Sequence, residues 1–228
     1  LRNGDFLFRE MVRDDRVFRS HKDGRSRITG FLEDYAAVGL GALALYELTF
    51  QPTWLDRARA LADAMVTWFW DDDAGAFFDT PSDHEQLLTR PRDITDNATP
   101  SGNSLAVELL LRLGDVRGDA DMTRRARFVL ESLAEPMARY PLAFGHALTV
   151  ADMAVFGAVE VALAGQPDSG DLKALVRAAS SPFVPSLVLA GGAPDGVALL
   201  ADRPMRDGRA TAYVCRASVC DQPVTDPG

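Results

Sequence analysis

Apolar and polar positions follow one another along this chain in a pattern that repeats. Two segments, 32–48 and 101–113, are nearly uncharged, and each is followed by a charged segment whose apolar residues recur at helical spacing. A nearly uncharged helix must be buried on most sides, whereas a helix with one apolar stripe packs one face and exposes the other. The pattern predicts two copies of a helix pair, each with a buried and a half-exposed member.

The half-exposed helices carry their apolar residues in matching positions. The stripe consists of Leu55, Ala58, Ala62, Met65 and Phe69 in the first copy and of Met122, Ala126, Val129, Leu133 and Met137 in the second. A third, weaker pair is predicted, with 149–164 as the buried helix and 171–179 as a short outer one. We therefore expect a mainly α fold with an inner and an outer ring of helices.

The two ends of the chain depart from this pattern. Residues 1–29 contain short apolar and basic alternations at 7–9 and 16–19, with turn signals at Asp14-Asp15 and Asp23-Gly24, which predict a small hairpin. Such hairpins are not stable alone, so we expect 1–29 to be a rim segment that continues an absent upstream part. Helix-hairpin repeats are expected over 30–180.

The last segment, 181–228, is expected to form a small α/β-like tail that contains strands. Apolar runs at 185–192 and 210–215 are typical of strands. The stretch between them, 196–201, is ambiguous between a helical turn and an extended piece.

Composition narrows the classes of function. The chain has 228 residues, 47% of them hydrophobic, and a net charge of -9. This charge argues against nonspecific nucleic-acid binding, since phosphate contacts need clustered Lys and Arg. The sequence has no run of about 20 apolar residues and no secretory leader pattern, so we expect no membrane partner and a cytoplasmic location.

Both nearly uncharged helices begin with polar residues. Glu33, Asp34 and Tyr35 open the first, and Asp96, Asn97, Ser101 and Asn103 surround the start of the second. Helix beginnings leave unpaired N–H donors and a partial positive charge. Acidic and amide side chains gathered there predict a small-molecule site.

Several of these segments, taken in order, resemble one family. The segments are GFLEDYA at 30–36, LYELT at 45–49, WL at 54–55, ATPSGNS at 98–104 and AYVC at 212–215, with Cys220 and Pro223 after them. They resemble thioredoxin-domain-containing proteins of the YyaL and spermatogenesis-associated type. The resemblance implies an N-terminal thioredoxin-like domain followed by an (α/α) toroid related to the N-acylglucosamine 2-epimerase and six-hairpin glycosidase folds. This chain lacks a Cys-x-x-Cys motif, and its three helix pairs match only part of the toroid, so it resembles the C-terminal part.

The resemblance implies a carbohydrate that is bound or processed at the N-terminal ends of the inner helices. A glycosidase needs two carboxylates, one of them protonated, about 5 to 9.5 Å apart. Asp34 and Asp96 are the candidate pair, and the candidate substrate-binding residues are Glu33, Tyr35, Asn97, Ser101 and Asn103. The alternative for both acids is a structural role, because an acid at a helix beginning interacts favourably with the helix dipole and can accept hydrogen bonds from the free N–H groups.

An epimerase would instead need a base and an acid, commonly two histidines. His21 lies in a basic stretch that could lean over the rim, and His84 lies in a polar loop. His146 precedes the third predicted buried helix, and it is our third candidate catalytic residue. The rival interpretation is a non-catalytic module that docks a thioredoxin-like domain.

The two cysteines, Cys215 and Cys220, are candidate redox residues. They have no other ligand cluster near them in the sequence, which argues against zinc. A disulfide across a tight turn, a thiol pair that serves the redox partner domain, and unreacted structural thiols all remain open, and a reducing cytoplasm favours the last.

Other patterns predict no metal and no cofactor. The Asp71-Asp72-Asp73 run lacks the distal Glu of a calcium loop and is more typical of a helix-end turn. Trp68, Trp70 and Phe78 offer either a sugar-stacking wall or, in our preferred interpretation, core packing. The chain has no nucleotide-binding glycine motif and no nucleophile elbow.

Overall fold

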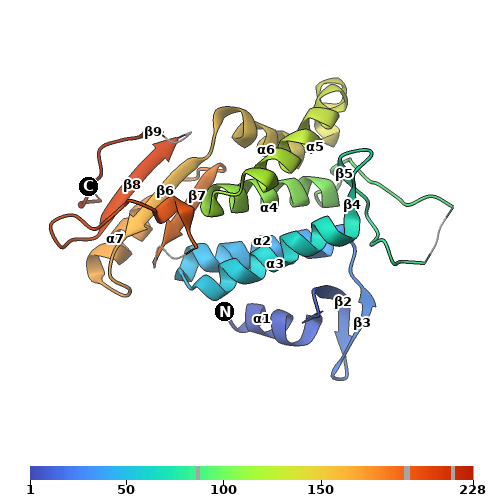
Figure 1. The fold of residues 1–228 in the computed structure, drawn as a ribbon, viewed down its shortest axis with the longest axis horizontal. Helices are drawn as coiled ribbons and strands as arrows, with labels where there is room; N and C mark the ends of the chain where they lie inside the picture. The colour runs from blue at the N-terminus through green and yellow to red at the C-terminus, as the bar shows by residue number, and fades with distance from the viewer. Residues whose placement is uncertain (86–87, 193–195, 217–218, 228) are drawn as a thin grey trace.

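A computed structural model describes residues 1–85, 88–192, 196–216 and 219–227. The chain is mainly helical with some sheet (Figure 1). The α-helices are α1 (Arg2–Phe6), α2 (Leu32–Thr49), α3 (Pro52–Phe69), α4 (Gly102–Arg117), α5 (Ala120–Arg139), α6 (Gly145–Phe156) and α7 (Gly170–Ser180). The strands are β1 (Val12–Arg13), β2 (Arg16–Lys22), β3 (Arg25–Thr29), β4 (Trp70–Asp71), β5 (Ala76–Phe77), β6 (Val159–Ala164), β7 (Leu187–Gly191), β8 (Thr211–Arg216) and β9 (Val219–Cys220).

Two helix hairpins, α2–α3 and α4–α5, form the centre of the molecule. Each predicted stripe residue of α3 and α5 is buried, which confirms the helical spacing taken from the sequence. Pro52 starts α3 at a position where its missing N–H costs nothing. In Figure 1, α2 and α4 start at the same end of the molecule and run toward the C-terminal sheet. The hairpins therefore bring the two polar helix beginnings to one end.

Close contact between α2 and α4 depends on a glycine. A Cβ built on Gly39 would lie 2.4 Å from Cδ2 of Leu109, which is itself fully buried. Gly41, two residues further along α2, is exposed and has open space around its ideal Cβ.

This contrast gives a matched pair of variants. Gly39→Ala is expected to destabilise the fold by about 1–2 kcal/mol relative to Gly41→Ala, because Leu109 has little room to move in a close-packed core. Gly41→Ala is expected to hold or raise stability, since Ala is a better helix former than Gly by roughly 1 kcal/mol. Urea unfolding of both variants measures the difference, and equal stabilities would contradict the close packing of α2 on α4.

The C-terminal sheet has the strand order β7-β6-β8-β9. β6 pairs in parallel with β7 and antiparallel with β8, and β8 pairs antiparallel with β9. The strands expected near 187 and 211 are confirmed, and the ambiguous stretch contains a 3₁₀ turn, Ala198–Leu200. The sheet contacts α2 and α4 through β7, and near the C-terminal end of α2 the Tyr46 hydroxyl donates to the carbonyl of Gly191 at 3.2 Å.

The third helix pair was predicted wrongly. Instead of one helix over 149–164, α6 ends at Phe156, Gly157 takes a left-handed φ of 80°, and β6 follows as the central strand of the sheet. The helix expected over 171–179 is present as α7, but it packs on this sheet, through Leu172 and Leu175, rather than outside a helical partner. With only two of the three expected helix pairs formed, the expectation that the chain is part of an (α/α) toroid remains a proposal.

The N-terminal segment is a three-stranded sheet, β1-β2-β3, preceded by helical turns. The turns expected at Asp14-Asp15 and Asp23-Gly24 are confirmed, and all four residues have positive φ. Residues 7–9, however, belong to a π-helix, Leu7–Met11, rather than to a strand. Phe8 from this turn packs against Trp54 of α3, which favours a compact helical turn over an extended strand.

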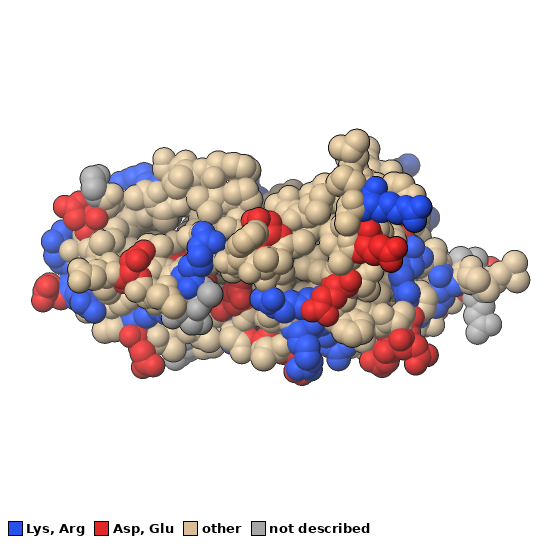
Figure 2. Space-filling model, turned by 90° about the horizontal axis from the view of Figure 1, so that it is seen from above, with Lys and Arg blue, Asp and Glu red and all other residues tan. Residues whose placement is uncertain are grey.

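Charged side chains of both signs are interspersed on the face that Figure 2 presents, with other residues between them. Among the described helices, none combines the length and apolar character that a membrane span requires.

Candidate functional site

A hollow of about 380 Å³ lies where α2 and α4 begin, and we name it the N-terminal hollow. Its wall comes from the start of α2, the segment that follows β5 and the segment that precedes α4. Polar side chains in the wall are Glu33, Asp79, Asp93, Thr95, Asn97 and Ser101, and two rings, Phe31 and His84, also line it. The sequence-based site residues Glu33, Asn97 and Ser101 are therefore brought together at one end of the molecule.

Asp79 is a half-buried carboxylate of the N-terminal hollow. Its Oδ2 accepts the backbone N–H of Asp93 at 2.7 Å, and its carbonyl accepts the N–H of Leu32 at 3.0 Å. Burial raises the pKa of Asp79; the hydrogen bond from Asp93 lowers it, and the nearby carboxylates of Asp93 and Glu33 raise it further, so that the net shift is upward. Asp79 therefore keeps its proton to a higher pH than an ordinary aspartate.

Glu33 differs from Asp79 because it forms an ion pair with Arg19. The Arg19 guanidinium donates to Oε1 of Glu33 at 2.7 Å, lies 3.1 Å from Oδ2 of Asp34, and lies 4.6 Å from the centre of the Phe31 ring. Phe31 in turn faces His84, with ring centres 6.0 Å apart. The hollow thus contains one carboxylate in an ion pair, Glu33, and one whose pKa is raised, Asp79.

Asp34 and Asp96, the expected catalytic pair, are both bound to backbone N–H groups. Oδ2 of Asp34 accepts the N–H of Phe31 at 2.8 Å, and burial raises the pKa of Asp34. Oδ1 of Asp96 accepts the N–H of Ser101 at 2.9 Å, while Oδ2 accepts those of His146 at 2.9 Å and Ala147 at 3.0 Å. This geometry fits the capping alternative for both acids.

Of the expected substrate-binding residues, three are buried: Tyr35, Ser101 and Asn103. Tyr35 is 0% exposed and packs against Phe69, with ring centres 5.0 Å apart. The Asn103 side chain accepts the N–H of Phe77 and donates to the carbonyl of Phe77, both at 3.1 Å, and so attaches β5 to α4. Ser101 caps α4 by accepting the N–H of Ser104 at 3.1 Å.

His146, the third candidate catalytic residue, pairs with Glu108 of α4 rather than with a residue of the hollow. Its Nε2 lies 2.9 Å from Oε2 of Glu108, whose other oxygen accepts from Arg112 Nε at 2.7 Å. The hydrogen bond to Glu108 raises the pKa of His146. The group is an ion-pair cluster that links α4 and α6.

The remaining candidates serve local structure. His21 Nδ1 lies 3.0 Å from the Ser26 hydroxyl within the β2–β3 hairpin. Trp68 lies 3.5 Å from the Arg16 guanidinium and Phe78 lies 3.9 Å from that of Arg90, so these rings stack on arginines rather than forming one wall.

The Asp71-Asp72-Asp73 run forms the β4–β5 turn, as preferred from the sequence. Oδ1 of Asp71 accepts the N–H groups of Asp73 at 3.1 Å and Ala74 at 3.4 Å. In the part of the chain that the structure describes, no group of three or more His, Cys, Asp or Glu is placed to hold a metal ion.

Cys215 and Cys220 form a disulfide between β8 and β9. The preference for unreacted thiols was therefore wrong, and the disulfide alternative holds. The preference rested on an assumed compartment, whereas the strand pairing places the two residues directly opposite each other.

Sequence reasoning missed Asp79 and Asp93. Both belong to the long stretch between β5 and α4, residues 78–101, and long connections of this kind within a compact domain are often functional. That length was the available signal, because neither residue lies on a helix with a readable period.

Known proteins resemble this chain over most of its length. Human spermatogenesis-associated protein 20 is 34% identical over 206 residues, which cover 87% of this chain and 26% of that protein. The mouse protein of the same name is 33% identical over the same shares, and an uncharacterized protein of Caenorhabditis elegans is 25% identical over 89% of this chain and 28% of its own length. The chain spans about a quarter of the length of the curated relatives it matches. No family model matches it.

These homologues confirm the expected likeness to the spermatogenesis-associated type. The implied thioredoxin-like domain and toroid remain expectations.

Proposed function

We propose that the chain binds a small carbohydrate in the N-terminal hollow and acts on it by acid–base chemistry. The observation that carries this proposal is the pairing of two unlike carboxylates in one hollow, Asp79 with a raised pKa and Glu33 in an ion pair with Arg19. Two titratable groups whose environments differ in this way supply an acid and a base.

The roles follow from these environments. Asp79 donates a proton to a sugar oxygen, and a second carboxyl group, that of Glu33 or Asp93, activates the water or stabilises the developing positive charge. Phe31 offers an apolar ring to one face of the sugar, while Asn97 and Thr95 offer hydrogen-bonding groups to its hydroxyls. Asp34 and Asp96 support the hollow by holding the helix beginnings.

Thermal unfolding in a panel of mono- and disaccharides tests the binding. A sugar that binds the folded chain stabilises it by about 2.7 kcal/mol at a hundredfold excess over its Kd, which raises the Tm by several degrees. If no sugar raises the Tm, the carbohydrate proposal fails. The exposed apolar side chains of α6, Val155 at 73% and Phe156 at 64%, then favour the alternative of a docking module.

Asp79→Asn tests the chemistry once a sugar is found. Asn keeps an oxygen for the Asp93 N–H but carries no transferable proton, so we expect sugar binding within about threefold of the original and turnover reduced by about 10²-fold or more. The rate for the unaltered chain should fall as the pH rises through the raised pKa of Asp79, because the proton donor is then lost. Asp73→Asn, an exposed aspartate of the β4–β5 turn, is the matched control and should leave both unchanged. Undiminished turnover in Asp79→Asn would overturn the assignment of Asp79.

A further inference from the structure

The Cys215–Cys220 disulfide has one buried end and one open end. Cys215 is 2% exposed and packs into the main core, whereas Cys220 is exposed on β9. Thiol–disulfide exchange requires a thiolate to approach one sulfur directly, so access decides which sulfur is attacked. The open end makes Cys220 the sulfur that an external thiolate reaches.

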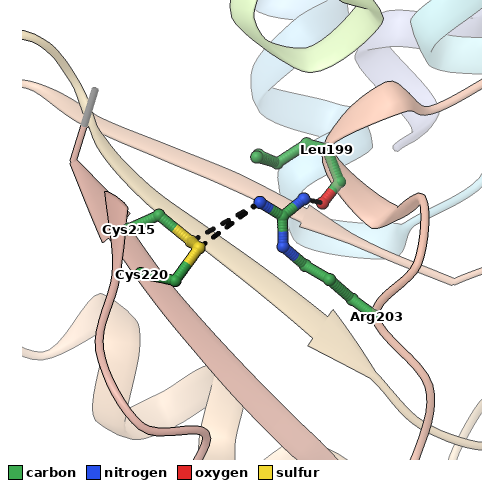
Figure 3. The surroundings of a disulfide bond; sticks show 4 residues. All are labelled: Leu199, Arg203, Cys215 and Cys220. Carbon is green, nitrogen blue, oxygen red and sulfur yellow. Dashed lines mark hydrogen bonds between the residues drawn. A yellow bond between two sulfur atoms is a disulfide. The ribbon is translucent and has the colours of Figure 1, made fainter. Parts of the chain in front are cut away.

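A guanidinium lies against both sulfurs. Nη2 of Arg203 is 3.5 Å from the Sγ of Cys215 and 3.5 Å from that of Cys220, and Figure 3 shows the side chain directed at the disulfide. A neutral disulfide gains little from a cation, whereas a thiolate gains a charge-assisted hydrogen bond. The arrangement therefore favours the negative charge that appears when the bond opens.

The fold holds this cation in place. Arg203 Nη1 donates to the carbonyl of Leu199, and the next residue, Pro204, accepts from the Tyr213 hydroxyl at 2.7 Å. Tyr213 lies two residues before Cys215 on β8, so both side chains face the same side of the sheet. The segment that carries Arg203 is thus fastened to the strand that carries the buried sulfur.

We propose that Cys215–Cys220 is a thiol–disulfide exchange site for an external thiol, with Cys220 as the attacked sulfur and Arg203 as the group that stabilises the departing Cys215 thiolate. The incoming thiolate forms a bond to the Cys220 sulfur, the Cys215–Cys220 bond breaks, and its electron pair stays on Cys215. A second thiolate then attacks the mixed disulfide, which releases an oxidised thiol pair and leaves both cysteines reduced. The two electrons come from the two thiols.

Mapping the mixed disulfide tests which sulfur is attacked. The purified, oxidised chain is treated with reduced glutathione at fixed pH, quenched with iodoacetamide and digested for mass spectrometry. Glutathione is expected on Cys220 and the alkyl group on Cys215. Glutathione on Cys215, or an equal division between the two, would overturn the proposal without any variant having to fold.

The rate of opening tests the part of Arg203. Arg203→Gln is expected to slow opening by at least about fivefold, since a leaving thiolate that is less stabilised departs more slowly. Arg209→Gln is the matched control, because it removes the same charge from another arginine of the C-terminal segment, one that is exposed and donates to the Thr225 carbonyl at 3.3 Å, and it should leave the rate unchanged. Far-UV circular dichroism checks that both variants keep the fold.

Two attacking thiols of different charge distinguish two possible roles of Arg203: stabilising the departing thiolate, or attracting an anionic thiol. Neutral 2-mercaptoethanol and anionic glutathione should be slowed by similar factors in Arg203→Gln if the cation acts on the departing sulfur. A slowdown for glutathione alone would show that Arg203 only attracts the anion, and an unchanged rate for both thiols would remove Arg203 from the site; either result contradicts its assigned role.

Discussion

Asp96→Ala is expected to lower the free energy of unfolding by about 3 kcal/mol, since three backbone N–H groups lose a charged acceptor at once. The donors are Ser101 before α4 and the first residues of α6, His146 and Ala147. α6 begins after Phe144, whose side chain makes no capping hydrogen bond, so Asp96 supplies the cap from a distant part of the chain. Urea unfolding at neutral pH measures the loss.

Matched variants separate capping from catalysis at Asp96. Asn97→Ala, at the exposed neighbouring residue, should change stability by less than about 0.5 kcal/mol, and Asp96→Asn should lose less than Asp96→Ala because it keeps a neutral acceptor. A loss below about 1 kcal/mol in Asp96→Ala, together with abolished sugar binding, would instead support the catalytic assignment made from the sequence.

The contribution of Asp96 also depends on pH. Burial alone would raise the pKa of Asp96, but the N–H donors of Ala147, Ser101 and His146, with the Ser104 hydroxyl, lower it overall. Because the folded pKa lies below the unfolded one, the stabilisation is complete above about pH 4 and disappears as the pH falls through the lowered value. The difference between the original chain and Asp96→Ala should therefore shrink in acid.

The helices were predictable because packing and sequence period agree in them. The stripe from Leu55 to Phe69 marks the face of α3 that the core covers, and nothing in its surroundings opposes helix formation. The segment 149–164 failed for a physical reason. Its mainly apolar composition suits a buried helix and a central strand equally, and only Gly157 with the valines at 159 and 161 indicated the change to β6.

The position of the candidate site could be predicted from the sequence, but most of the residues that line it could not. Polar residues at two helix beginnings located the end of the molecule where the N-terminal hollow lies, and Glu33, Asn97 and Ser101 line it. The acids nearest the helices, Asp34 and Asp96, accept hydrogen bonds from backbone N–H groups. Free N–H groups of this kind at helix beginnings were the reason for predicting a site there. Two other carboxylates of the hollow, Asp79 and Asp93, come from a loop, where sequence alone gives no spatial order.

Glu108→Gln is expected to destabilise the chain by about 1–3 kcal/mol near pH 6, because His146 and Arg112 both lose their charged partner. The Glu108 carboxylate is 17% exposed and lies between His146 Nε2, at 2.9 Å, and Arg112 Nε, at 2.7 Å. Arg112 also donates to the carbonyls of Leu187, at 2.6 Å, and Pro185, at 2.7 Å. The cluster therefore ties α4 to α6 and to the edge of the C-terminal sheet.

The pKa shifts set the pH range of this effect. The raised pKa of His146 means that its stabilisation is complete below about pH 6.5 and is lost as the pH rises through the folded value. Burial alone would raise the pKa of Glu108, but the hydrogen bond from His146 and the charge of Arg112 lower it, so its stabilisation is complete above about pH 4.5 and is lost in acid. The cost of Glu108→Gln should be largest between these limits and smaller at pH 9.

Urea unfolding across this pH range measures the cost of Glu108→Gln, and an NMR titration measures the pKa of His146. In Glu108→Gln the His146 pKa should fall toward the ordinary histidine value, since the main cause of its increase is gone. Asp168→Asn is the control: it breaks the exposed ion pair with Lys173, and it should alter stability by less than about 0.5 kcal/mol at every pH. A His146 titration that does not move in Glu108→Gln would show that the two side chains do not form the pair that joins α6 to α4.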